Sequence, residues 1–178
     1  MTARAAVWFV GLFAALALLP LLREAGGGQL AFWGIYALLV LALVPALLAS
    51  APVAARWRRV PLVLIALPLS WGATLGWAAI FGEIGWKDEN LNALIFLLGR
   101  QILVVGLVEE LFFREAGLRA LGRGGPALAV LLAAFAVFHL HSGPWAMLSA
   151  FGIGAVYLGL RLNGVPVLGL ALGHGLGN

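Results

Sequence analysis

The 178-residue sequence contains no cysteine, and only 10% of its residues are charged. Without cysteine the chain cannot form a disulfide, a thiolate nucleophile or a zinc–thiolate site. A soluble domain carries about a quarter charged residues, whereas this chain is 63% hydrophobic with a mean hydropathy of +1.07. So little charge excludes an ordinary soluble domain and is typical of an integral, multi-pass membrane protein.

The net charge is +4, but the basic residues are scattered between apolar segments. This pattern indicates control of membrane topology and disfavours nucleic acid as a partner. The lipid bilayer is the expected environment. A β-barrel would need short alternating segments, and the apolar runs here are long and continuous. We therefore predict an all-α fold, a polytopic transmembrane helix bundle in which residues 1–178 form a single membrane domain.

We expect about seven membrane helices, at Ala5–Leu22, Leu30–Ala49, Pro61–Phe81, Leu91–Leu121, Pro126–Leu140, Trp145–Leu160 and Val165–Asn178. About 20 residues span a bilayer core, so most of these segments are long enough. We expect an uncleaved anchor in the first segment, because no clear signal-peptide cleavage site precedes Arg23. The fourth segment is too long and should be tilted or broken. The last is only about 21 Å long, so it ends inside the bundle or continues in the native chain.

Glycines recur every fourth residue along the last segment, at Gly169, Gly173 and Gly177. Glycine on one face of a membrane helix lets a second helix approach closely, because no side chain separates the two backbones. We therefore expect another helix to pack tightly against this face.

Polar side chains inside membrane segments are rare and costly, so they are candidates for a functional site. The second half of the chain places seven of them in apolar segments: Arg100, Glu109, Glu110, Arg114, His139, His174 and Asn178. We expect His141 to be an interfacial residue, and Glu115 and Arg119 to form a solvated pair at the end of the fourth segment.

The positions of Glu109 and His139 predict that the two side chains meet. The turn between the fourth and fifth segments is centred near Gly124, with Glu109 15 residues before it and His139 15 residues after it. In an antiparallel helical hairpin both residues then lie at the same depth, about 20 Å of helix from the turn. The sequence therefore predicts a Glu–His pair inside the bilayer.

The two adjacent glutamates should have different partners. Glu110 and Arg114 are four residues apart, with the glutamate first, which is the favourable order for a helical ion pair. Glu109 is rotated from Glu110 by about 100° around the helix. One carboxylate is then neutralised by arginine, and the other is free to face a site.

The other polar residues also fall on common helix faces. Phe135 and His139 are four residues apart, as are His174 and Asn178. Each residue alone has a structural explanation, such as a hydrogen-bonded histidine or a helix terminus. Together with Glu109, however, they place four polar groups on three helices that can converge, which packing alone does not explain.

These residues form three motifs: EExxxR at Glu109–Arg114, FxxxH at Phe135–His139 and HxxxN at His174–Asn178. In this order and spacing, residues 91–178 resemble the CAAX protease and bacteriocin-processing family, also called the ABI family. This family of polytopic intramembrane proteases includes the type II CAAX prenyl endopeptidases. By resemblance, the residues that support the motif helices are Glu110, Arg114 and Phe135.

The resemblance also implies roles in catalysis. Glu109 and His139 would bind and activate the attacking water, while His174 and Asn178 would complete the site and steady the oxyanion. Two mechanisms remain open: a metal-free, glutamate-type hydrolysis, or a divalent metal such as zinc held by Glu109, His139 and His174. The asparagine is an unusual zinc ligand but a suitable oxyanion donor. We favour direct activation of water by the Glu–His pair.

Three functions compete on these residues. The first is an intramembrane endopeptidase that cleaves a membrane-associated or prenylated, CAAX-type peptide or protein. The second is a non-catalytic scaffold or bacteriocin-immunity protein. The third is a small proton or solute transporter, because intramembrane glutamate and histidine can relay protons. The complete set of Glu109, His139, His174 and Asn178 favours the first.

The distribution of basic residues predicts the orientation in the membrane. The side that holds the N-terminus would carry seven basic residues: Arg4, Arg56, Arg58, Arg59, Arg119, Arg123 and Arg161. The opposite side would carry only Arg23 and Lys87. Since basic loops stay in the cytoplasm, we expect a cytoplasmic N-terminus.

A reporter fused to Met1 should respond as a cytoplasmic protein, and the Arg56–Arg59 loop should resist protease added to intact cells. An external Met1 reporter would overturn this orientation.

Overall fold

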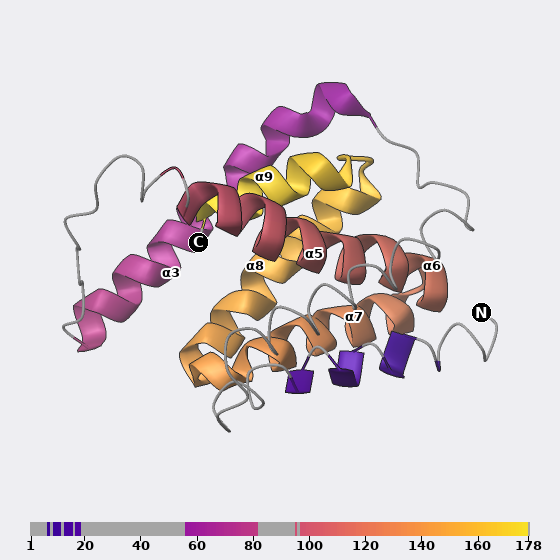
Figure 1. The fold of residues 1–178 in the computed structure, drawn as a ribbon, viewed down its shortest axis with the longest axis horizontal. Coiled ribbons are helices and arrows are strands. Elements are labelled where there is room, and N and C mark those ends of the chain that lie inside the picture. Colours follow the sequence, from indigo (N-terminus) through magenta and orange to yellow (C-terminus); the bar gives the residue numbers. More distant parts are fainter. Residues whose placement is uncertain are drawn as a thin grey trace.

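The computed structural model describes residues 7, 9–11, 13–15, 17–18, 56–81, 95 and 97–177. Within these residues all regular elements are helical, as Figure 1 shows. The elements are η1 (Trp57–Ile65), α3 (Ala66–Phe81), η2 (Arg100–Gly106), α5 (Leu107–Glu110), η3 (Leu111–Ala116), α6 (Gly117–Leu121), α7 (Gly125–Phe138), η4 (His139–Ser142), α8 (Pro144–Leu162) and α9 (Val167–Gly177). Here η1 and η4 are 3-10 helices, while η2 and η3 are π-helical.

Three helical runs among the described residues are long and apolar enough to cross a membrane: Trp57–Ile80, Gly125–Ser142 and Pro144–Leu162. Large apolar side chains on them are exposed, including Leu64, Leu75, Val130 and Leu148. Outward-facing apolar residues suit contact with lipid. The all-α fold is therefore confirmed for the described residues, with three candidate membrane spans, whereas about seven membrane helices stays a prediction. The second expected segment, Leu30–Ala49, lies outside the described residues, as does much of the first.

The fourth expected segment is a single helical run from residue 97 to Leu121 in the described part of the chain. The run is not broken in this part, and the other expected outcome, a tilt in the membrane, stays a prediction. The run contains two π-helical stretches, η2 and η3, on either side of α5. A π turn adds a residue to the turn and so changes which side chains share a face; such turns are frequent at functional sites. The four-residue α5 between them carries both Glu109 and Glu110.

Aromatic side chains pack around the helical run from residue 97 to Leu121, which we call the long helix. The ring of Phe9 stacks on Phe112 with centroids 4.8 Å apart, and Phe113 meets Phe135 edge to face at 5.1 Å. All four rings are buried. This packing holds the helix against α7 and against the N-terminal helical residues.

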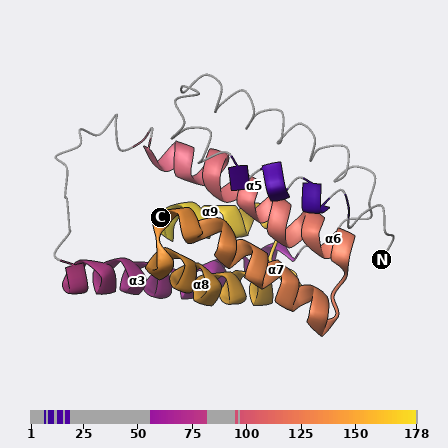
Figure 2. The same cartoon turned by 90° about the horizontal axis from the view of Figure 1, so that it is seen from below.

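The helix α9 lies between the run η1–α3 on one side and the long helix on the other, as Figures 1 and 2 show. The face of α9 that carries Gly169, Gly173 and Gly177 contacts η1 and α3. An ideal Cβ built on Gly169 would lie 3.0 Å from Val60 Cγ2, and one on Gly173 would lie 2.8 Å from Val63 Cβ. The close approach expected from the glycine spacing is therefore confirmed.

The opposite face of α9 is equally close to the long helix. A Cβ on Gly175 would lie 2.6 Å from the backbone N and Cα atoms of Ile102. On the long helix, a Cβ on Gly106 would lie 2.7 Å from the Ala171 carbonyl oxygen. Glycine on both sides of the contact therefore lets α9 carry its histidine, His174, directly against α5.

We expect Gly175→Ala to destabilise the fold, because the new methyl group must displace backbone atoms of Ile102. Overpacking of this kind costs about 1–3 kcal/mol. Gly159→Ala in α8 is the matched control, since a Cβ there meets nothing within 4 Å among the described residues. Thermal unfolding in detergent measures both. Equal melting temperatures for the two variants would show that the contact between α9 and the long helix is loose.

Candidate active site

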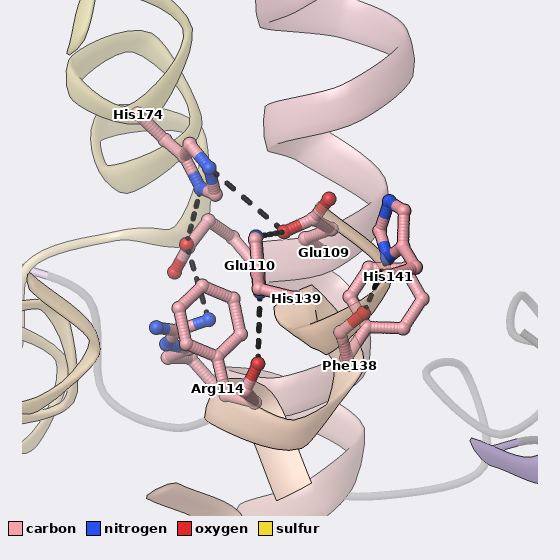
Figure 3. Close-up of polar contacts among 8 residues, drawn as sticks. Glu109, Glu110, Arg114, Phe138, His139, His141 and His174 are labelled. Atoms are coloured by element: carbon pink, nitrogen blue, oxygen red, sulfur yellow. Dashed lines mark hydrogen bonds and ion pairs between the residues drawn. The ribbon is translucent and has the colours of Figure 1, made fainter. Parts of the chain in front are cut away.

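The side chains of Glu109 and His139 meet, as the equal offsets predict. The chain reverses at Gly122, which has a φ of 95°, and α7 then runs back along the long helix. Glu109 Oε2 lies 3.7 Å from His139 Nε2. Figure 3 shows the two side chains pointing toward each other.

His174 reaches the same carboxylate from α9. Its Nε2 atom lies 3.8 Å from Glu109 Oε2, and its Nδ1 atom lies 2.8 Å from Glu110 Oε1. The predicted convergence of Glu109, His139 and His174 is therefore present. The contact between His174 and Glu110 is an additional one, which the sequence did not predict (Figure 3).

The buried pair of Glu110 and Arg114 forms the base of this cluster. Glu110 Oε1 lies 3.3 Å from Arg114 Nη1, and the side chains are 0% and 2% exposed. The Arg114 guanidinium carbon lies 3.8 Å from the centroid of the Phe135 ring, which is close enough for a cation–π interaction. The same ring contacts His139 at 4.7 Å. Phe135 thus packs between the buried arginine and one of the two histidines.

Hydrogen bonds assign the proton on each imidazole ring. The Phe135 carbonyl oxygen can only accept, so the Nδ1–H of His139 must donate to it, at 2.8 Å. Glu110, ion-paired to Arg114, is likewise an acceptor and receives the Nδ1–H of His174. In a neutral ring the other nitrogen then has no hydrogen. Each neutral histidine therefore presents the lone pair of Nε2 to Glu109.

When both histidines are neutral, three acceptors face one another at the centre of the site. Glu109 Oε2 is buried and has no hydrogen-bond partner among the described residues. Its separations of 3.7 and 3.8 Å from the two Nε2 atoms are too long for direct hydrogen bonds. The group that satisfies such a cluster must donate more than one hydrogen, and water does so.

A cleft of about 450 Å³ adjoins both histidines. Its walls come from α3, η2, α7, η4, α8 and α9, and they include Trp77, Trp145 and Ser149. The indole nitrogen of Trp145 donates to the Ala73 carbonyl oxygen at 3.1 Å, which ties the start of α8 to α3. This volume lies within the usual range for ligand sites. The cleft is therefore large enough to bring a small substrate segment to the two imidazoles.

The remaining expected residues have different outcomes. Asn178 lies outside the described residues, so its role stays a prediction. His141 is exposed, and its Nδ1 atom lies 2.8 Å from the Phe138 carbonyl oxygen. Figure 3 places His141 beside Phe138. Among the described residues, the histidines that pair with Glu109 are His139 and His174, not His141. This histidine does not join the cluster.

The expected Glu115–Arg119 pair is present, but the expectation that it is solvated is wrong. Glu115 is only 4% exposed and bonds to two arginines. One is Arg119, and the other is buried Arg161, whose Nε donates to Glu115 Oε2 at 3.0 Å. Arg161 lies on α8, 46 residues away, so helical spacing could not indicate it. The second cation explains why the carboxylate can be buried.

Tyr157 is a further residue that sequence patterns did not indicate. It is fully buried on α8, and its ring stacks on His174 with centroids 5.7 Å apart and an interplanar angle of 26°. A single tyrosine in an apolar helix carries no spacing signal. Its position shows that a packed ring restricts the orientation of the His174 imidazole.

The cluster contains the types of side chain that bind zinc, namely one carboxylate and two histidines that donate through Nδ1. However, no group of three or more His, Cys, Asp or Glu side chains in the described part of the chain is arranged to hold a metal ion. We therefore derive the chemistry from these side chains and water alone.

One comparison with known proteins matches this half of the chain. The family model described as type II CAAX prenyl endopeptidase Rce1-like matches residues 90–178, which is half of the sequence. This range contains every residue of the cluster. No curated protein and no solved structure matches the chain.

We expect Glu110→Ala to destabilise the protein, because it leaves Arg114 buried without its carboxylate. Breaking one partner of a buried ion pair costs about 3–5 kcal/mol. Removing the arginine as well, in Glu110→Ala/Arg114→Ala, should cost less than the sum of the two single changes. Melting temperatures of the four proteins in detergent measure this coupling. Additive losses would mean that the two side chains do not stabilise each other.

Proposed function

The chain belongs to the type II CAAX prenyl endopeptidase Rce1-like family, and from this premise we propose that it hydrolyses peptide bonds through Glu109 and His139. Membership of this family, together with the apolar helices, identifies an integral membrane protein of a protease family.

One observation carries the proposal: a buried carboxylate oxygen of Glu109 faces the Nε2 atoms of two histidines. A water molecule here can donate one hydrogen to Glu109 and the other to an imidazole nitrogen. Both lone pairs of the water oxygen are then turned away from these acceptors. This arrangement prepares the water to attack a carbonyl carbon in the adjoining cleft.

In the proposed reaction Glu109 acts as the general base. It takes a proton as the water oxygen bonds to the carbonyl carbon, and a tetrahedral intermediate forms. The proton then passes to the amide nitrogen, directly or through His139, as the C–N bond breaks. The products are a carboxylic acid and an amine, so the reaction consumes one water molecule and needs no other reactant.

The negative oxygen of the intermediate requires a hydrogen-bond donor. We assign this role to Asn178, the residue of the HxxxN motif whose amide has N–H groups to give. His174 has a different constraint, because its Nδ1–H is donated to Glu110. It could steady the oxyanion only with a second proton on Nε2. In the neutral form it serves as an acceptor for the attacking water.

The proposed substrate is a peptide segment that reaches the cleft from the membrane. The family description supports a CAAX-type, prenylated peptide. Two tryptophans, Trp77 and Trp145, supply apolar surface in the cleft, while Ser149 and other hydroxyl side chains supply polar groups. Both a peptide backbone and an apolar substituent therefore find complementary surface.

We predict that Glu109→Gln abolishes cleavage of a CAAX-type peptide while the melting temperature stays near the wild-type value. The amide keeps the shape of the carboxylate but cannot accept the proton from water. Loss of a general base lowers the rate by about 100- to 10,000-fold. Single-turnover assays on the purified protein, with prenylated and unprenylated peptides, measure the effect.

His139 and His141 provide a matched pair of variants for the same assay. His139→Ala should lose activity, whereas His141→Ala should retain it, because only the former ring faces Glu109. Equal activity in the two variants would contradict the assignment. A chelator arm tests the metal alternative: activity that disappears with chelator and returns with zinc would replace the metal-free mechanism.

A further inference from the structure

A second candidate site lies at the start of η1, away from the catalytic cleft. Three arginines and a tryptophan, at Arg56, Trp57, Arg58 and Arg59, line a hollow of about 660 Å³. The lining of the cleft begins at Ser70 of α3 and continues with residues of η2, α7, η4, α8 and α9. No described residue lines both cavities.

The arginines of the hollow form no ion pair with a carboxylate of the described residues. The described glutamates are Glu109, Glu110 and Glu115, and their ion pairs are with His139, His174, Arg114, Arg119 and Arg161. None of the ion pairs in the described part of the chain includes an arginine of the hollow. Arg59 donates to the Asn163 carbonyl oxygen, which carries no net charge.

The local helix adds to this positive field. The first turn of η1 contains no acidic residue, and no side chain caps its N-terminus. A helix N-terminus carries a partial positive charge and usually has acidic neighbours. Arginines at this position repel the helix dipole unless an anion lies near them.

The surroundings indicate which anion. The run Trp57–Ile80 is one of the helices able to cross a membrane, so the hollow lies at the end of a membrane span. Trp57 is 61% exposed, as expected for an aromatic residue at the lipid–water interface. Exposed Leu62, Leu64 and Ile65 follow directly. Apolar surface below a cluster of arginines matches the acyl chains and the phosphate of a phospholipid.

We propose that the hollow formed by Arg56, Trp57, Arg58 and Arg59 binds the headgroup phosphate of an anionic phospholipid. Guanidinium groups bind phosphate oxygens through paired N–H donors. Trp57 lies at headgroup level, and the acyl chains lie along the apolar residues of η1.

The bound lipid also stabilises the helix that carries His174. The backbone N–H of Arg56 donates to the Gly164 carbonyl oxygen at 2.7 Å, so the hollow is tied to the turn before α9. Further along η1, Val60 and Val63 pack against glycines of α9. An anion that offsets the repulsion among the arginines therefore stabilises the contact between η1 and α9.

The test is thermal unfolding of the full chain in detergent micelles with increasing phosphatidylglycerol. The melting temperature should rise with this lipid and stay unchanged with phosphatidylcholine, which has no net charge. Arg58→Gln should raise the half-saturating lipid concentration on the order of fivefold, given the usual contribution of one basic residue at an anionic surface. Arg56→Gln should do the same and provides a second variant.

Arg123→Gln is the matched control, because Arg123 is also exposed and loses the same single charge. Its half-saturating concentration should equal that of the wild type. An equal weakening in Arg58→Gln and Arg123→Gln would show general surface attraction and overturn the site. An equal rise in melting temperature with glycerol 3-phosphate would identify a soluble phosphate as the ligand and overturn the lipid assignment. A melting temperature that does not rise with phosphatidylglycerol would also overturn the lipid assignment.

Discussion

The close contact between α9 and the long helix is the constraint on which the candidate active site depends. At Gly175 and Ile102, and again at Gly106 and Ala171, the backbones approach so closely that a side chain would not fit. This contact brings His174 within reach of both glutamates of α5. A larger residue at either glycine would move the imidazole away from the carboxylates, whatever the rest of the bundle did.

The second requirement is that charge buried among apolar helices be compensated. Glu110 has two partners, the Arg114 guanidinium and the His174 imidazole, and the Phe135 ring covers the arginine. Glu109 differs from its neighbour because, among the described residues, its ion-pair partners are two imidazole nitrogens that act as acceptors when neutral. The adjacent carboxylates therefore have different surroundings: Glu110 is held in the buried cluster, and Glu109 is the one to which we assign the chemistry.

Regular helix geometry explains which parts of this arrangement could be predicted. The rise per residue is uniform, so equal offsets from Gly124 placed Glu109 and His139 at one depth, and the four-residue spacing paired Glu110 with Arg114. The glycine spacing likewise indicated a close helix contact. Contacts between helices distant in sequence were missed: His174 with Glu110, and Arg161 with Glu115. They depend on crossing angles and on π-helical turns, which a hydrophobic pattern does not encode.

We propose that Glu109 and His139 activate one water molecule together. A double-mutant cycle on single-turnover cleavage, with Glu109→Gln, His139→Ala and the double variant, tests it most directly. Residues that act as one unit show strongly non-additive losses. If both side chains bind the same water, the double variant should be about as slow as the slower single variant. If the fold-loss in cleavage rate of the double variant equals the product of the two single losses, the two side chains act independently, which contradicts a shared water.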